Sequence, residues 1–359
     1  MYDDAITYLE SVAPDEDVLI VHHWDMDGSA SAAIISEILE AVRGTPADTI
    51  CLPRGRKHTV GPRAENVIRN KEVDRLIVLD MNVPADRLSE LAGLGPDILL
   101  IDHHTFDEIP DDAVFVNPRV EDEEAYVPAA KLCNDIAAEF GLDRDWIAGL
   151  GIIQDFAVEG HEDLFERLKE QHPRYFPEKI TQHAMAKECR YGKYSTVMNI
   201  KPYSDTDRCA RLAHDALVNS DGLEGLEVQE EYGRLKEYYQ QMQRELEQVI
   251  TRFEDEKQVY EDERLVTFRF ASDFHINSSI ATNVSMEDED WVYLVANTHG
   301  GEASISARCQ SGRLDLGRVM QDALPDDVAG EAGGHRAAAG ASVPVAALDR
   351  FLANVRELL

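Results

Sequence analysis

Asp97-Ile98-Leu99-Leu100-Ile101-Asp102-His103-His104 is the stretch that decides the fold. Its apolar run predicts a buried strand, and the residues that follow place a carboxylate and two imidazoles at the carboxyl end of that strand. The same layout recurs: residues 17–21 (Asp-Val-Leu-Ile-Val) lead into 22–28 (His-His-Trp-Asp-Met-Asp-Gly), and residues 76–79 (Leu-Ile-Val-Leu) lead into Asp80. The carboxyl ends of parallel strands meet at one crevice, where ligands bind. Because crowded Asp side chains repel one another unless cations lie between them, the sequence predicts a metal cluster with two ions.

Strands and helices alternate between residues 15 and 160, which predicts an α/β fold with a parallel sheet covered by helices on both faces. The expected strands lie at 17–23, 49–53, 75–81, 97–102 and 113–117, and the expected helices at 29–42, 62–70, 85–93, 128–140 and 143–156. The Asp27-Gly28 turn directly precedes the first of these helices, and a helix N-terminus is a favourable place for a phosphate group.

A change of pattern after residue 160 indicates a second, smaller α/β domain. Residues 160–220 are helical and irregular, and residues 223–256 predict a long polar amphipathic helix, which we interpret as a solvated connector rather than a coiled-coil dimer. Strands are then expected at 265–270, 291–297 and 303–308, with helices at 276–284, from near Asp315, and from near Val345 to Leu358. The predicted domains are a catalytic metal-binding domain at 1–195, a helical linker at 196–258 and a substrate-binding domain at 259–359.

The chain is strongly acidic: among 359 residues, 69 are acidic and 35 are basic, which gives a net charge of −34 at pH 7. An acidic excess spread along the whole chain is typical of a halophilic protein in a very salty cytoplasm, where salt screens charge repulsion; an acidic mesophile protein is the alternative. The overall field repels nucleic acid, so contact with a strand depends on local basic residues. Arg54-Gly55-Arg56-Lys57-His58 with Arg63, and a group between Lys187 and Arg211, are either nucleotide contacts or solvated faces.

Several signals point to the cytoplasm. No apolar run reaches the length of a membrane span. The first residues, Met1-Tyr2-Asp3-Asp4, lack the charged-then-apolar layout of a signal peptide. Five scattered cysteines without a C-x-x-C pair indicate reduced thiols and argue against a cysteine-based zinc site. We therefore expect a cytoplasmic protein with no membrane contact.

Alternating polar residues follow the first strand. His23, Asp25 and Asp27 lie on alternate residues of a segment that leaves the strand, and alternation would point all three side chains to one side. A plain acidic loop would have the same sequence, and His22 is the alternative imidazole. Asp80, at the end of a neighbouring strand, can bridge two cations with one carboxylate, although an Asp at a strand end often caps a turn.

Asp102-His103-His104 offers an imidazole ligand, a second imidazole, and a carboxylate that can orient one of the rings. The alternative is a helix-capping Asp beside surface histidines, but adjacent histidines at a strand end favour a metal site. Asp155 closes an apolar helix, and taken alone such a residue is more often a cap than a ligand.

The second domain has its own candidate site. Arg308, at the end of an expected strand, and His335, in a glycine-rich loop at residues 330–340, would grip a phosphate group. The backbone amides of Gly333 and Gly334 would help, since glycines let a ligand approach the backbone closely. The alternative is a tight turn that binds nothing.

Together these motifs resemble those of the DHH phosphoesterase superfamily, in its DHHA1 subfamily, which includes RecJ-like and oligoribonuclease-like enzymes. The resemblance covers nearly the whole chain, and its motifs are His23-Trp24-Asp25-Met26-Asp27-Gly28, Asp80, Asp102-His103-His104, Asp155 and the stretch from Gly333 to Gly340. The chain departs from the family pattern where Met81-Asn82 follows Asp80 in place of a nearby glycine, and where Glu331-Ala332 interrupts the glycines. Neither departure removes a ligand.

The resemblance implies two divalent ions, with Mn²⁺ preferred and Mg²⁺ or Co²⁺ as alternatives, because mixed imidazole and carboxylate ligation suits manganese. One ion would be held by His23, Asp25 and Asp80, and the other by Asp27, Asp80, His103 and Asp155, so that Asp80 bridges them. Asp102 and His104 would be the catalytic residues beside the ions, with His104 near the scissile phosphate.

The expected activity is two-metal hydrolysis of phosphodiester bonds in single-stranded DNA or RNA, or in short oligonucleotides, as in a RecJ-like exonuclease or an oligoribonuclease. Arg308 and His335 would fix the terminal phosphate in a crevice between the domains. A small-nucleotide phosphatase or cyclic-dinucleotide phosphodiesterase is the alternative, since the chain has no obvious OB-fold extension to track a long strand. A further alternative is a non-catalytic binding subunit of a replication or repair assembly. Every expected ligand is present, which favours an enzyme, with replication or repair proteins as candidate partners.

Overall fold

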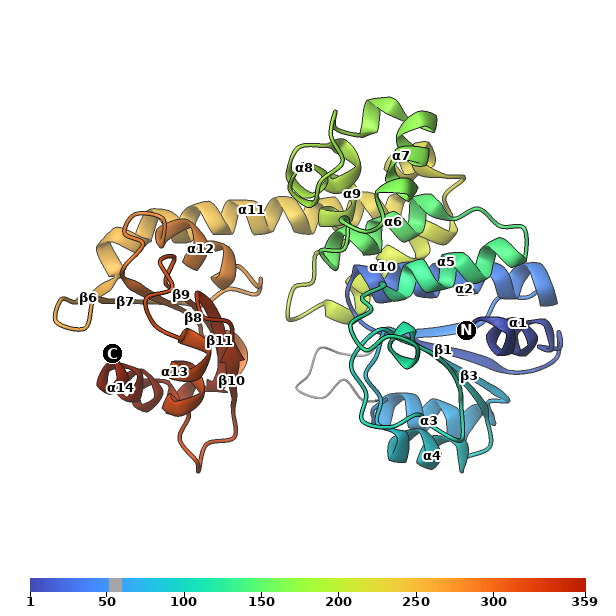
Figure 1. The fold of residues 1–359 in the computed structure, drawn as a ribbon, viewed down its shortest axis with the longest axis horizontal. Helices are drawn as coiled ribbons and strands as arrows, with labels where there is room; N and C mark the ends of the chain where they lie inside the picture. The colour runs from blue at the N-terminus through green and yellow to red at the C-terminus, as the bar shows by residue number, and fades with distance from the viewer. Residues whose placement is uncertain (52–59) are drawn as a thin grey trace. The chain divides into compact units, whose positions relative to one another are not determined.

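The computed structural model describes residues 1–51 and 60–359 (Figure 1). It divides into two compact units: residues 1–201 with 205–237, and residues 202–204 with 238–359. The domain boundaries expected from the sequence, after residues 195 and 258, stay predictions. In the described part of the chain, no helix is long and apolar enough to cross a membrane.

The first unit is built on a five-stranded sheet in the order β2-β1-β3-β4-β5, with every neighbouring pair parallel, which confirms the predicted parallel sheet. Its strands are β1 (Val18–His22), β2 (Asp48–Cys51), β3 (Arg75–Leu79), β4 (Asp97–Ile101) and β5 (Val114–Val116). The register pairs His22 with Leu79, and Leu79 with Ile101, so β1, β3 and β4 end at the same level. The residues that follow these strands therefore emerge at one edge of the sheet.

Helices cover both faces of this sheet, with α2 and α5 on one side and α3 and α4 on the other (Figure 1). Every residue of β1 is buried, as expected for a strand covered on both faces. On the α3–α4 side, Ile68 and Leu88 pack with Val78 and Leu100 in one apolar cluster. The helices of this unit are α1 (Asp3–Glu10), α2 (Met26–Arg43), α3 (Pro62–Lys71), α4 (Ala85–Ala92), α5 (Ala129–Glu139), α6 (Asp145–Gln154), α7 (Glu162–Gln171), α8 (Gln182–Lys187), α9 (Arg190–Met198) and α10 (Thr206–Val218), with short 3₁₀ helices at Pro118–Val120 and Pro173–Tyr175.

The connector expected at 223–256 is two elements rather than one. A 3₁₀ helix spans Leu223–Val228, and α11 spans Glu230–Glu256. Gln229 lies between them with an extended backbone, which interrupts the helical hydrogen bonding. Helix α11 contributes residues to both units, because the division between them falls after Glu237.

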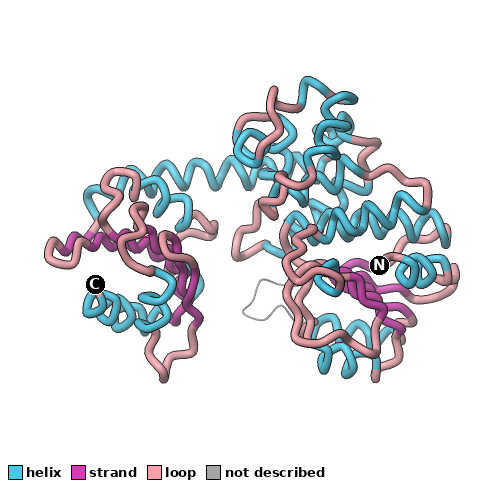
Figure 2. The backbone as a smooth tube through the Cα atoms, in the orientation of Figure 1, coloured by secondary structure: helices cyan, strands magenta, loops and turns pink. Residues whose placement is uncertain are grey.

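The second unit contains a six-stranded mixed sheet in the order β10-β11-β9-β8-β7-β6, in which β7 and β8 are parallel and the other pairs antiparallel. Helices α13 and α14 pack on one face, where Met320 and Phe351 join a cluster with Ile305. Figure 2 shows the strands of this unit in magenta beside these helices. The elements are β6 (Gln258–Tyr260), β7 (Leu265–Phe270), α12 (Asn277–Val284), β8 (Val292–Asn297), β9 (Glu302–Arg308), α13 (Leu316–Ala323), β10 (Glu331–Gly334), β11 (Ala338–Pro344) and α14 (Leu348–Leu358), with 3₁₀ helices at His299–Gly301 and Val345–Ala347.

The loop expected at 330–340 is instead a β-hairpin, so that prediction is wrong. Strands β10 and β11 pair antiparallel, with Gly333 opposite Gly340, and β11 continues the sheet against β9. Glycine and alanine have low strand propensity, so the local sequence does not indicate these strands. The pairing with β9 is a long-range backbone interaction, which a local pattern cannot reveal.

Candidate metal centre

Carboxylates and imidazoles gather at the carboxyl edge of the parallel sheet. These side chains form three overlapping groups, and within each group the possible ligand atoms lie within 4.8 Å of one another. The groups are His23 with Asp25 and Asp80, Asp80 with His103 and His104, and Asp27 with His103 and Asp155. Asp80 and His103 each belong to two groups. The structure thus brings together the residues expected to hold two ions.

The first group forms at the turn from β1 into α2. The Nδ1 atom of His23 lies 2.7 Å from Asp25 Oδ2 and 3.4 Å from Asp80 Oδ2. Asp25 is the N-cap of α2 and accepts a hydrogen bond from the backbone N–H of Gly28 at 3.0 Å. A Cβ atom at Gly28 would lie 2.5 Å from the carbonyl oxygen of His23, so this tight turn requires glycine.

The expectation that alternation points all three side chains to one side is wrong, because Asp27 belongs to a different ligand group from His23 and Asp25. Asp27 is not on an extended segment, because α2 begins at Met26. The chain turns from strand into helix between His22 and Met26, so Asp27 projects from the first turn of α2. His22 points elsewhere: its Nδ1 lies 2.7 Å from the carbonyl oxygen of His23, and its ring stacks on His214.

Asp27 is fully buried and receives two backbone hydrogen bonds from the start of α5. The N–H groups of Ala129 and Ala130 donate to its two carboxylate oxygens at 2.8 and 2.9 Å. On the other side, a Cβ atom at Gly151 of α6 would lie 2.7 Å from Asp27 Oδ1. Helices α5 and α6 therefore fix this carboxylate in place.

Asp80 and Asp155 both face His103. The Nε2 atom of His103 lies 3.3 Å from Asp80 Oδ1, 3.3 Å from Asp155 Oδ2 and 4.0 Å from Asp27 Oδ2. Asp80 has a left-handed backbone with φ of 57°, a conformation that few residues with a side chain adopt. Such backbone strain often occurs at functional sites, where it places a side chain for chemistry.

His104 is held by Asp102 in the way expected from the sequence. Its Nδ1 lies 2.7 Å from Asp102 Oδ1, and its backbone N–H donates to Asp102 Oδ2 at 3.3 Å. Burial alone would lower the pKa of His104, but the hydrogen bond and charge of Asp102 outweigh burial and raise the pKa to about 9. The ring is therefore oriented and protonated at neutral pH.

Burial sets the charge state of the remaining acids. It raises the pKa of Asp27 to about 8, assisted by the charge of Asp80, and raises the pKa of Asp155 to about 8, assisted by Asp27 and Asp25. Burial and the charge of Asp25 raise the pKa of Asp80 well above its ordinary value. Buried acids that repel one another this strongly, mixed with imidazoles, form a donor set that fits divalent cations such as Mn²⁺.

Burial alone would lower the pKa of His23, but the effect of the neighbouring carboxylates is larger. Asp25 and Asp80 together raise the pKa of His23 to about 10. Burial would raise the pKa of Asp25, but the charge and hydrogen bond of His23 hold the pKa of Asp25 well below the ordinary range. In the metal-free protein this pair is therefore an imidazolium and a carboxylate.

Three residues that support the site were not identified from the sequence. The Asn117 side-chain amide donates to the carbonyl oxygen of His104 at 3.0 Å. The Arg119 guanidinium donates to the carbonyl oxygen of His103, also at 3.0 Å. The Tyr126 hydroxyl donates to the carbonyl oxygen of Asp155 at 3.1 Å. Asn117 directly follows β5, so its place at a strand end was a usable signal, whereas Tyr126 lies in an irregular segment without one.

The expected phosphate-binding residues of the second unit lie at the end of β9 and in the β10–β11 hairpin. Arg308 lies opposite Ala338 in the sheet, and its guanidinium donates to Ser278 Oγ at 2.8 Å and Thr282 Oγ1 at 3.2 Å. The backbone N–H of His335 donates to the carbonyl oxygen of Ala338 at 2.8 Å, which closes a tight turn.

Gly333 and Gly334 lie in the hairpin strand that leads into this turn. Gly334 has φ of 134°, and a Cβ atom there would lie 2.6 Å from the Cα of Ala339, so this position requires glycine. The turn is thus real, and a phosphate-binding role for it stays a prediction.

Some residues of the basic segments are engaged with acids or backbone. Arg54, Arg56, Lys57 and His58 lie outside the described residues. Arg63 forms an ion pair with Asp207. In the second group, Lys201 is buried and donates to the carbonyl oxygen of Met198 at 2.8 Å.

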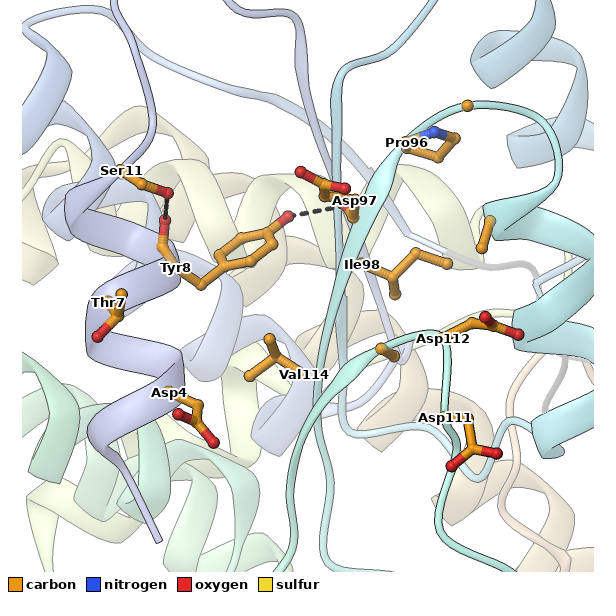
Figure 3. Close-up of a pocket in the computed structure, with 13 residues that line it drawn as sticks. Asp4, Thr7, Tyr8, Ser11, Pro96, Asp97, Ile98, Asp111, Asp112 and Val114 are labelled. Atoms are coloured by element: carbon orange, nitrogen blue, oxygen red, sulfur yellow. Dashed lines mark hydrogen bonds between the residues drawn. The ribbon is translucent and has the colours of Figure 1, made fainter.

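A cavity of about 680 Å³ lies at the opposite edge of the parallel sheet, where β4 and β5 begin (Figure 3). The Tyr8 hydroxyl donates to the carbonyl oxygen of Asp97 at 2.9 Å in this cavity. Acidic side chains, including Asp4, Asp111 and Asp112, line it. Their charge repels phosphate, so this cavity does not suit a phosphoester.

Two family models match this chain. Residues 17–176 match the model described as "DHH family, N-terminal domain", and residues 265–359 match the model of the DHHA1 domain. A sequence search of curated proteins finds no match.

Several solved structures share the fold. The crystal structure of exonuclease RecJ bound to manganese has a TM-score of 0.70 at 17% identity, covering 99% of this chain and 93% of that one. RecJ in complex with Mn²⁺ from Thermus thermophilus has a TM-score of 0.69 at 18% identity, and the match covers 99% of this chain and 54% of that one. CDC45 from Entamoeba histolytica has a TM-score of 0.55 at 10% identity, covering 99% and 98%. At these identities the likeness establishes the fold alone.

Proposed function

Since the chain belongs to the DHH family of phosphoesterases and carries a DHHA1 domain, we propose that it hydrolyses phosphodiester bonds of short single-stranded oligonucleotides with two divalent cations. One observation carries this proposal: the ligand groups at the carboxyl edge of the sheet overlap through Asp80 and His103. Groups that overlap in this way suit two neighbouring cations, and a pair of cations suits one phosphoryl group.

The ligands divide between two ions. We assign His23, Asp25 and Asp80 to one, and Asp27, Asp80, His103 and Asp155 to the other, with Asp80 shared. The mixture of imidazole and carboxylate favours Mn²⁺, with Mg²⁺ and Co²⁺ as alternatives. When bound, the cations would supply positive charge to the phosphoryl oxygens and lower the pKa of a nearby water.

His104 and Asp102 supply the proton chemistry of the proposed reaction. In the metal-free protein, Asp102 raises the pKa of His104 to about 9, which favours a protonated ring. A positioned imidazolium can donate that proton to the oxygen that leaves phosphorus, or a hydrogen bond to a phosphoryl oxygen. Asp102 stabilises the charge and fixes the ring orientation through its 2.7 Å contact with Nδ1.

Arg308 is proposed to hold the terminal phosphate of the substrate, with His335 and the backbone of Gly333 and Gly334. Ser278 and Thr282 already orient the guanidinium. Replacing Arg308 with Ala should therefore raise KM and lower kcat/KM on oligonucleotides without loss of metal. Unchanged kcat/KM on a pentanucleotide would contradict this role and leave the hairpin as a structural turn.

Short substrates are favoured over long strands. A long strand is bound through many phosphate contacts with basic side chains. This chain has a net charge of −34, and Arg63 and Lys201 are engaged with acid and backbone partners. Few phosphates would therefore be contacted at once, which also leaves a small-nucleotide or cyclic-dinucleotide substrate as the second candidate. Replication or repair proteins stay proposed partners.

The test is a substrate panel. Labelled 5-mer and 30-mer DNA and RNA are incubated with and without Mn²⁺, with bis-p-nitrophenyl phosphate as a generic phosphodiester. We expect Mn²⁺-dependent release of mononucleotides, faster from the 5-mers. Hydrolysis of the generic ester without release from any oligonucleotide would favour the small-nucleotide alternative, and no hydrolysis at all would favour a binding subunit.

A further inference from the structure

Phe156 is an aromatic residue in an unusual place. It directly follows the proposed ligand Asp155, and 77% of its surface is exposed. An aromatic ring usually contributes to stability by being buried, and the exposed ring of Phe156 makes little contribution of this kind.

The backbone of Phe156 is strained as well as exposed. Helix α6 ends at Gln154, and the N–H groups of Phe156 and Ala157 donate to the carbonyl oxygens of Ile153 and Ile152 at 3.3 and 3.1 Å. This is the Schellman ending of a helix, whose left-handed position usually holds glycine. Here Phe156 occupies that position with φ of 54°. The fold therefore bears both backbone strain and an exposed ring at one residue.

A second exposed ring is fixed to the same ligand. Tyr126 is 47% exposed, and its hydroxyl donates to the Asp155 carbonyl oxygen at 3.1 Å, one peptide bond from Phe156. Its ring lies edge-on to His103, with centroids 5.2 Å apart. The Tyr126 side chain is thus hydrogen-bonded to Asp155, the residue that precedes Phe156 in the chain.

We propose that Phe156, with Tyr126 beside it, is a stacking platform for a nucleobase of the substrate. This inference rests on the proposed function and extends it, since it restricts the substrates to phosphoesters that carry a base. Stacking on an aromatic ring is tolerant of base identity. It also avoids the electrostatic repulsion that weakens phosphate contacts with a chain of net charge −34, and it persists in high salt. A base-binding role accounts for both the backbone strain and the exposure of Phe156.

The variant Phe156→Gly separates function from folding. Glycine relieves the left-handed strain, so the melting temperature should rise, while the platform is lost. Phe156→Tyr keeps a ring. Glu72→Gly is the matched control, because exposed Glu72 ends α3 with the same left-handed backbone, φ of 50°, away from the ligand cluster. It should raise the melting temperature and leave kcat/KM unchanged.

The substrates are a pentanucleotide and the same chain with an abasic sugar at the 5′ or the 3′ end. For the wild type, an abasic unit at the cleaved end should lower kcat/KM about tenfold, as expected for one lost base–aromatic stack. Phe156→Gly should lose about tenfold on the intact pentanucleotide and should no longer discriminate against the abasic one. Retention of full discrimination by Phe156→Gly would overturn the platform.

A fluorescence measurement keeps this test separate from the proposed function. Terminal 2-aminopurine is quenched when it stacks, so stopped-flow mixing of a 2-aminopurine pentanucleotide with the protein reports stacking before any turnover. Quenching by the wild type and by Phe156→Tyr, but not by Phe156→Gly, supports the platform even if no bond is cleaved, in which case the proposed hydrolysis alone fails. Equal quenching by Phe156→Gly, or none by the wild type, overturns the platform even if hydrolysis occurs.

Discussion

Asp80 combines two unfavourable features at one residue. Its carboxylate is 2% exposed among other acids, and its backbone is left-handed. Left-handed backbone at a residue with a side chain costs about 1–3 kcal/mol, and burial beside Asp25 raises the pKa of this carboxyl well above its ordinary value, so its ionisation is disfavoured. Two cations would offset the charge, so we infer that the metal-bound protein is the stable form.

Asp80→Asn should remove the shared ligand while keeping the fold, because Asn has the same shape and tolerates left-handed backbone. We expect fewer than two ions per chain and a loss of hydrolysis of at least about 100-fold, as when one group that stabilises a transition state is removed. Metal analysis and the melting temperature check this. Asp97→Asn, at the opposite end of β4, is the control and should keep both ions. Two fully occupied ions in Asp80→Asn would refute the shared-ligand assignment.

Metal binding should release protons below pH 8. Burial raises the pKa of Asp27 and Asp155 to about 8, so both hold protons in the metal-free protein at pH 6.5. The cations must displace these protons and also the proton of the proposed ligand His23, whose pKa is raised to about 10, so affinity should rise with pH up to about 10. Calorimetric titration with Mn²⁺ in two buffers of different ionisation enthalpy measures the protons released. Equal heats in both buffers at pH 6.5 would show that these acids are already ionised.

The same pKa values predict how pH affects the stability of the metal-free protein. A folded pKa above the ordinary value of 3.8 means that the folded state binds more protons than the unfolded state between about pH 4 and 8. The contribution of Asp27 and Asp155 to the free energy of unfolding should therefore fall as pH rises through that window. Chelation should lower the melting temperature more at pH 8.5 than at pH 6. A larger effect of chelation at pH 6 would contradict this sign.

At the scale of elements, close approach positions the site. The start of α5 donates two hydrogen bonds to Asp27, and α6 comes near enough that Gly151 has no room for a side chain. A Cβ atom there would lie 2.7 Å from Asp27 Oδ1 and 2.9 Å from the Cβ of Ala130. The position of the Asp27 carboxylate therefore depends on how α2, α5 and α6 pack together.

Two glycine-to-alanine changes in helices should act in opposite directions. Alanine is favoured over glycine inside a helix by about 1 kcal/mol. Gly233 in α11 has nothing within 4 Å of an added Cβ, so Gly233→Ala should raise the melting temperature and keep activity. Gly151→Ala should lower it, since overpacking costs about 1–3 kcal/mol, and should weaken metal binding through Asp27. Calorimetry and metal titration of both variants test this; equal stabilisation by the two would show that α6 can shift away from Asp27.

At the scale of the whole molecule, charge dominates. A net charge of −34 on 359 residues makes the compact state repel itself at low salt. We expect the melting temperature to rise as KCl increases from dilute buffer to molar concentration, because salt shortens the range of that repulsion. Thermal melts followed by circular dichroism test this expectation. A melting temperature independent of KCl would argue against adaptation to high salt.

Much of the architecture follows from local sequence. The apolar runs that end in His22, Leu79 and Ile101 identified three parallel strands, and the acids and imidazoles after them identified the edge where they meet. Apolar runs bounded by polar residues are local signals, and the carboxyl-end rule then places the site. The β10–β11 hairpin escaped this reasoning, because glycine and alanine strands are held by pairing with β9 across the sequence.

The sequence by itself determined which residues are candidates for the chemistry and that most of them follow the ends of strands, since those depend on residue type and local periodicity. Only the tertiary structure decided their geometry. The strand-to-helix turn after β1 places Asp25 at the N-cap of α2 and Asp27 in its first turn, Asp80 adopts a left-handed backbone, and α5 and α6 enclose Asp27. Burial by these distant elements also raises the pKa of Asp27 to about 8. The folded chain leaves Phe156 exposed, with the left-handed backbone that usually belongs to glycine. These properties depend on contacts between segments far apart in the chain, which no local pattern encodes.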